Sequence, residues 1–108
     1  MARPPKRKQR PIPALAALEA IVGKLTLGKL LWSIREGSDQ TQAAFAGKLG
    51  VSKAHLCDIE KGRRNVSVER AARWAKLLEH SERQFVKLAI QGELDAKGIR
   101  LTVDVKAA

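Results

Sequence analysis

Four side chains that can donate, accept or react chemically lie in the short stretch "VSKAHLCDIEKG": Lys53, His55, Cys57 and Asp58. A paired cysteine and histidine is one pattern of nucleophilic catalysis. Here the two residues are two positions apart, so on a helix they point in divergent directions. The two histidines and one cysteine of the chain also lack the spacing of a zinc site. The stretch therefore indicates hydrogen bonding to a partner, and we expect no catalytic residues, no metal, no cofactor and no enzyme activity.

The charge balance indicates what kind of partner this is. Twenty-one Lys and Arg residues against eleven Asp and Glu residues give a formal charge of +10. Such a charge favours a polyanion, either nucleic acid or an anionic membrane surface. No apolar run approaches the roughly 20 residues of a membrane span, and a single cysteine suits a reducing compartment. We therefore expect a cytoplasmic, nucleoid-associated protein with no membrane partner.

Apolar spacing and capping residues predict an all-α chain with five or six helices. Leu27, Leu31 and Ile34 share one helical face, for example, and Ser81 with Gln84 has the pattern of a capping box. Thr41, Ser52 and Ser67 are the other predicted N-caps. The predicted helices cover residues 14–22, 27–36, 42–49, 53–60, 68–78 and 81–94.

The two ends of the chain have different patterns. Residues 1–13 hold four prolines and five Lys/Arg residues without an acid, which predicts a disordered basic arm. Near the other end, the apolar residues alternate with polar ones, which predicts a short β-strand. These apolar residues are Ile99, Leu101, Val103 and Val105. Because no second strand is predicted, this strand should pair with a copy of itself or with another partner; a frayed tail is the alternative.

The helices at 42–49 and 53–60 form a recognisable pair. Gly50 lies at the turn between them, where a left-handed backbone favours glycine, and the small Ala46 permits a close helix crossing. The apolar positions fall where two short helices would meet: Phe45, Leu49, Val51, Leu56 and Ile59. This pattern predicts a helix-turn-helix, whose second helix fits the major groove of DNA.

The segment "TQAAFAGKLGVSKAHLCDIEKGRRNVS" resembles the phage-repressor-like (Xre-type) helix-turn-helix family of transcriptional regulators. The stretch from Leu27 to Arg35 is similar to the first helix of that family, and "SVERAARWAKLL" is similar to its fourth. The resemblance covers Leu27 to Leu78, about half of the chain. Gln40 is the main departure, because the family usually has a leucine there.

By this resemblance, one set of residues would contact DNA bases and another the DNA backbone. Lys53 can donate to guanine, Asp58 can accept from cytosine, and Ala54 can only meet a thymine methyl group. His55 completes the predicted base contacts, although packing at the surface is an equal alternative. The predicted backbone contacts are Thr41, Gln42, Ser52, Cys57, Arg63, Arg64 and Asn65.

Several of these residues have other interpretations. Cys57 can be a half-buried structural residue, and Arg63 with Arg64 can form an ordinary charged loop. Glu60 is expected to close its helix and hold the loop, without touching DNA.

The expected organisation has four parts: a basic arm (1–13), an extra N-terminal helix and link (14–26), a DNA-binding domain (27–80), and a C-terminal helix and strand for dimerisation (81–108). The predicted dimer residues are Val86, Ile90, Leu94, Ile99, Leu101, Val103 and Val105. The expected function is a homodimeric repressor of transcription that binds double-stranded DNA. One alternative is an antitoxin that neutralises a toxin protein and represses its own operon, and a weaker one is a non-specific nucleoid or RNA binder.

Overall fold

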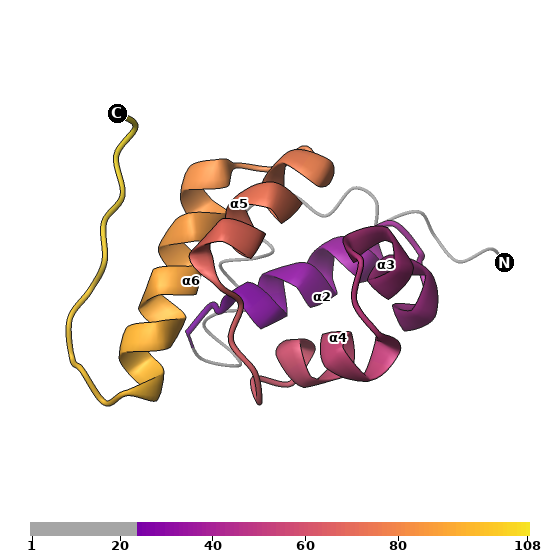
Figure 1. The fold of residues 1–108 in the computed structure, drawn as a ribbon, viewed down its shortest axis with the longest axis horizontal. Coiled ribbons are helices and arrows are strands. Elements are labelled where there is room, and N and C mark those ends of the chain that lie inside the picture. The colour runs from indigo at the N-terminus through magenta and orange to yellow at the C-terminus, as the bar shows by residue number, and fades with distance from the viewer. Residues whose placement is uncertain (1–23) are drawn as a thin grey trace, which may run out of the picture.

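Five α-helices make up residues 24–108, the part of the chain that the computed structural model describes (Figure 1). They are α2 (Leu27–Gly37), α3 (Gln42–Leu49), α4 (Lys53–Glu60), α5 (Val68–Leu77) and α6 (Glu82–Ala96). The predicted bounds of α3 and α4 are confirmed, and those of the other three helices differ by one or two residues. The predicted arm at 1–13 and helix at 14–22 lie outside the described residues.

Side-chain hydroxyls cap the start of all five helices. Each of these oxygens accepts a hydrogen bond from the backbone N–H three residues later, which satisfies a donor that has no partner inside the helix. The capping residues are Thr26, Thr41, Ser52, Ser67 and Ser81. Gly50 ends α3 with φ of 79°, the left-handed conformation expected at this turn. Short-range sequence chemistry therefore sets where the helices begin.

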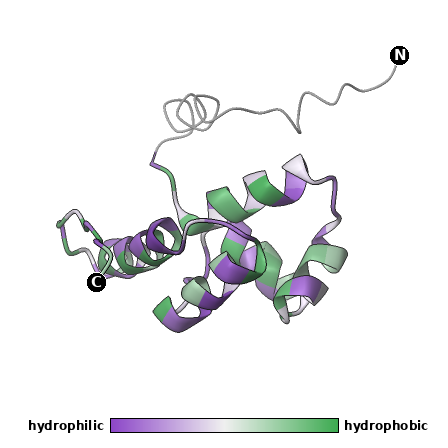
Figure 2. Cartoon of the chain, turned by 90° about the horizontal axis from the view of Figure 1, so that it is seen from above, coloured by the Kyte–Doolittle hydropathy of each residue, from purple (hydrophilic) through white to green (hydrophobic). Residues whose placement is uncertain are grey.

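One hydrophobic core joins α2, α3, α4, α5 and α6. Trp74 of α5 lies at its centre, and its indole N–H donates to the carbonyl oxygen of Leu49 at 3.1 Å. Phe45 of α3, Leu56 of α4 and Phe85 of α6 are fully buried with it. Figure 2 shows hydrophobic and hydrophilic residues mixed along the helices, as expected when each helix buries only one side. This core fixes α4 to the other helices.

Gly28 lets α2 approach α4 more closely than any other residue would. A Cβ atom at this position would collide with the backbone carbonyl oxygen of Ile59, in the last turn of α4. Because a backbone oxygen cannot rotate away as a side chain can, this contact is open only to glycine. Gly28 thus determines how closely the two helices pack.

A buried ion pair connects the ends of α2 and α4. Arg35 donates from Nε to Glu60 Oε2 at 2.8 Å and from Nη2 to Glu60 Oε1 at 3.1 Å. Only 10% of the Arg35 side chain and 4% of the Glu60 side chain is exposed. The pairing raises the pKa of Arg35 above its ordinary value, chiefly through the hydrogen bond to Glu60. Helix α4 ends at Glu60 as expected, but the side chain of Glu60 bonds to α2 and α3 and not to the loop of residues 61–65.

Two glutamines extend this ion pair to α3. Gln42 donates from Nε2 to Glu60 Oε1 at 2.9 Å, and Arg35 Nη1 donates to the carbonyl oxygen of Gln40 at 3.1 Å. The side chain of Gln40 donates to Ser38 Oγ at 3.0 Å. The end of α2, the start of α3 and the end of α4 therefore meet at one hydrogen-bonded cluster.

The prediction of a β-strand near the C-terminus is wrong for the single chain. No residue from 99 to 108 has a strand partner among the described residues, and the segment runs extended beside α6 (Figure 1). Its one set of strand-like hydrogen bonds comes from a side chain: Gln91 Nε2 donates to Leu101 O at 2.7 Å, and Gln91 Oε1 accepts from Val103 N at 2.8 Å. A strand needs the backbone of a neighbouring strand, and α6 offers only this amide.

Replacing Gly28 with alanine should lower the free energy of unfolding by about 3 kcal/mol, because α2 must move away from the backbone of Ile59. Urea unfolding followed by circular dichroism measures the change. Gly47→Ala is the matched control, since an added methyl group there meets nothing within 4 Å in the interior of α3. The control should stabilise by about 0.5–1 kcal/mol. Equal effects of the two substitutions would contradict the close-packing argument.

Replacing Glu60 with glutamine should cost about 3–5 kcal/mol, because the substitution leaves the guanidinium of Arg35 buried without its counter-charge. Glu36→Gln is the control: Glu36 also contacts Arg35, at 3.6 Å, but its side chain is 32% exposed. Because solvent reaches Glu36, this pair should contribute less, about 1 kcal/mol or below. The same urea experiment compares the variants, and a Glu60→Gln loss no larger than that of Glu36→Gln would refute the role of the buried pair.

Candidate nucleic-acid interface

Helix α4 has one buried side and one open side. Leu56 and Ile59 are 0% and 2% exposed and pack into the core. Lys53 and Ala54, in the first turn, are exposed, and neither makes a side-chain hydrogen bond or ion pair to another residue between 24 and 108. The structure therefore leaves the start of α4 open to a partner, at the positions where sequence reasoning expects base contacts.

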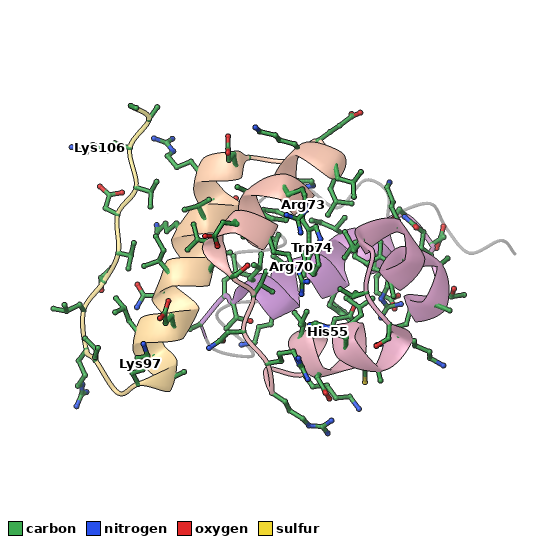
Figure 3. The ribbon with its side chains drawn as sticks, viewed as in Figure 1. His55, Arg70, Arg73, Trp74, Lys97 and Lys106 are labelled. Carbon is green, nitrogen blue, oxygen red and sulfur yellow. The ribbon has the colours of Figure 1, made fainter. Side chains whose placement is uncertain are left out.

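His55 is half-buried on α4. Its pKa is lowered from 6.5, first by desolvation and then by the positive charges of Arg64 and Arg70, while Asp58 acts in the opposite direction. Figure 3 shows His55 on α4 facing the part of α5 that carries Arg70 and Trp74. The imidazole thus lies among cations, where a nearby anion would be favoured.

Asp58 is occupied within the chain. Its carboxylate accepts from Arg63 Nη1 at 3.2 Å, and its backbone carbonyl accepts from the Arg63 N–H at 2.8 Å. Both side chains are exposed, 36% for Asp58 and 63% for Arg63, so the ion pair is weak and open to exchange. A base that donates a hydrogen bond to Asp58 would compete with Arg63 for the carboxylate.

The loop after α4 carries the predicted phosphate contacts on the surface. Arg63, Arg64 and Asn65 are all exposed, and Gly62 turns the chain with φ of 80°. The acids of α4 are already compensated, Glu60 by Arg35 and Asp58 by Arg63. The basic residues around α4 consequently present a net positive surface.

The side chains of Thr41 and Gln42, at the start of α3, bond within the protein. Gln42 uses its side-chain nitrogen to hold Glu60, and Thr41 uses its hydroxyl to cap Ala44 N at 3.1 Å. The backbone N–H groups of the first turn are what this helix end can present to an anion. Ser52 likewise caps α4 by accepting from His55 N at 3.0 Å, and Cys57 is half-buried with a free thiol.

Two basic residues near α4 are absent from the sequence-based set. Lys61 is exposed directly after α4. Arg70 lies on α5, its guanidinium carbon 5.7 Å from the centre of the Trp74 ring, and its charge acts on His55. One sequence signal indicates Arg70: it lies in the first turn of α5, three residues after the N-cap Ser67, and α5 follows the loop of residues 61–65.

The central part of the chain matches a known protein family. Residues 26–85, more than half of the 108, match a family described as "Helix-turn-helix domain". Comparisons with curated proteins and with solved structures give no match. None of the described helices is long and apolar enough to cross a membrane. The matched residues span α2 to α5 and include the pair α3–α4, so the chain belongs to the helix-turn-helix domain family, whose members bind DNA.

Proposed function

We propose that this protein is a sequence-specific regulator of transcription that inserts α4 into the major groove of double-stranded DNA. The observation that carries the proposal is the two-sided character of α4: Leu56 and Ile59 are buried, whereas Lys53 and Ala54 are open beside the basic loop. A helix held in this way can enter the groove without losing its place in the core.

The proposed contacts follow from chemistry and position. Lys53 donates to guanine, Ala54 meets a thymine methyl group, and Asp58 accepts from cytosine by exchanging its partner Arg63. His55 lies at the flank of this contact. The proposed backbone contacts are the backbone N–H groups of Thr41 and Gln42, with Ser52, Cys57, Arg63, Arg64 and Asn65. Arg70, whose charge acts on His55, and Lys61, which directly follows α4, join this set.

We further propose a homodimer that binds a palindromic operator and represses by occluding a promoter, as the resemblance to Xre-type regulators implies. Two copies related by a two-fold axis fit half-sites one helical turn apart, about 34 Å. The predicted dimer residues of α6, namely Val86, Ile90 and Leu94, are half-buried, as are Val103 and Val105. Ile99 and Leu101 are exposed.

The second candidate is an antitoxin. The exposed Ile99 and Leu101 lie on a segment outside the matched residues 26–85, and an extended segment can add to the sheet edge of a toxin. An adjacent reading frame for a small toxin, with neutralisation that needs residues 99–105, would favour this function. DNA binding would then serve regulation of the protein's own operon.

The purified protein should bind duplex DNA from upstream of its own gene at least several hundredfold more tightly than a shuffled duplex. Fluorescence anisotropy across a salt series measures both affinities. Lys53→Ala should cost about 1–3 kcal/mol of binding to the native duplex and much less on the shuffled one. Lys106→Ala, which removes the same charge at the far end of the molecule (Figure 3), is the control. Equal binding to both duplexes, lost steeply with salt, would reduce the proposal to non-specific attraction.

The pKa of His55 should move in opposite directions with folding and with DNA binding. In the free folded protein it lies below 6.5, so this residue contributes stability above pH 6.5 that is lost as the pH falls below that value. Bound phosphates should raise the pKa, because they favour the imidazolium. DNA affinity should therefore rise as the pH falls through this range.

Imidazole NMR titration of the protein with and without duplex measures both pKa values. His55→Gln is the control, since it should remove this contribution to the pH dependence of affinity. A His55 pKa that stays the same when duplex binds would place this residue outside the phosphate contact.

A further inference from the structure

The C-terminal segment, residues 99–105, is held to α6 along one of its two backbone edges. Gln91, only 6% exposed, donates to the carbonyl oxygen of Leu101 and accepts from the N–H of Val103. This is the bonding pattern that a neighbouring strand would supply. Gln91 also donates to Asp95 Oδ1 at 3.0 Å, and this bond, together with one from Lys24, lowers the pKa of Asp95. The amide that sets the position of the segment is therefore itself fixed.

The other edge of the segment is open. In an extended chain the N–H and C=O groups of one residue point to one side and those of the next residue to the other. With Leu101 and Val103 turned towards α6, the backbone groups of Arg100, Thr102 and Asp104 point away from it. None of these groups makes a hydrogen bond within residues 24–108. Figures 1 and 2 both place the segment at one end of the molecule, outside α6.

The side chains of Arg100, Thr102 and Asp104 are complementary to the same side chains of a second copy. When two copies run antiparallel about a two-fold axis at Thr102, Arg100 of each copy lies opposite Asp104 of the other, and the two Thr102 residues face one another. Opposite charges and threonine pairs are both favourable cross-strand neighbours. Arg100 and Asp104 lie at equal distances from Thr102 and have opposite charges, so a two-fold pairing brings opposite charges together.

In the same register the exposed apolar side chains of one copy lie opposite apolar side chains of the other. Leu101, 64% exposed, comes opposite Val103 of the other copy, and Ile99, 41% exposed, comes opposite Val105. A two-stranded ribbon alone is marginally stable in water. Here each strand is backed by α6, where Val86 and Val105 line one cleft together with Arg83. The pairing would thus bring the apolar side chains of both segments together on one face of the ribbon.

We propose that two copies of this chain join through their 99–105 segments as an antiparallel ribbon centred on Thr102, with two Arg100–Asp104 ion pairs between the copies. The occupant of the open edge is therefore a second copy of the same segment. This inference deepens the proposed function, on whose dimer it rests, and specifies which atoms form the dimer.

Charge reversal tests the register. Arg100→Asp places like charges opposite each other at both ion pairs, and so does Asp104→Arg; each variant alone should weaken the dimer about tenfold or more. Mixing the two variants restores opposite charges at both positions, so the mixture should form a heterodimer about as tight as the original. Sedimentation velocity over a concentration series measures each constant. Both side chains are exposed, so circular dichroism should show unchanged folding.

Cross-linking provides a second measurement. Thr102→Cys in a Cys57→Ser background should form a disulfide between copies under mild oxidation, because opposite residues in such a pair have Cα atoms about 5.5 Å apart. Lys106→Cys in the same background is the control, since its two copies would lie about 27 Å apart at 3.4 Å per residue. Equal cross-linking at both positions would overturn the register.

The remaining outcomes separate this inference from the proposed function. A monomeric protein, or single variants that stay as dimeric as the original, would overturn the ribbon even if specific DNA binding holds. A dimer that depends on both charges but binds no DNA would support the ribbon and refute the regulator. A protein that stays monomeric alone but captures a toxin through residues 99–105 would indicate addition to the toxin's sheet edge and would overturn the self-pairing.

Discussion

The ion pair between Arg35 and Glu60 joins α2 to α4 at a point that the solvent barely reaches. A buried charge pair is costly to form, and it is tolerated only when the geometry is good and the remaining polar atoms are satisfied. Both conditions hold: Arg35 and Glu60 are joined by two hydrogen bonds, Gln42 donates a third to Glu60, and the carbonyl of Gln40 accepts from Arg35. Because these groups come from three helices, one cluster determines how α4 is held relative to α2 and α3.

This arrangement explains how a helix of only eight residues is held in place. An isolated helix of that length is not stable in water. Helix α4 is held by Leu56 and Ile59 in the core, by the Ser52 cap at its start and by Glu60 at its end. Because Gly28 of α2 has no Cβ atom, α2 packs directly against the backbone of Ile59 in α4. The interactions that stabilise α4 lie on its buried side or at its ends, which leaves the side chains of Lys53 and Ala54 exposed.

The C-terminal segment illustrates a different principle. Its alternating residues have the period of a strand, yet no strand forms among the described residues, because a ladder requires a second backbone. Gln91 substitutes for that backbone at one place only, between Leu101 and Val103. The segment is therefore hydrogen-bonded along one backbone edge and open along the other, where a second strand could pair with it.

The sequence by itself determined the helices and the type of domain, since hydroxyl N-caps, the glycine at position 50 and apolar spacing are local features that act within a few residues. It also identified Lys53 and Ala54 as open positions and Glu60 as a structural residue. Only the tertiary structure decided that Arg35 reaches Glu60, that Arg70 acts on His55, and that Gln91 takes the place of a strand. Arg35 and Glu60 are 25 positions apart, and no local pattern records such a contact, because it arises from packing between helices.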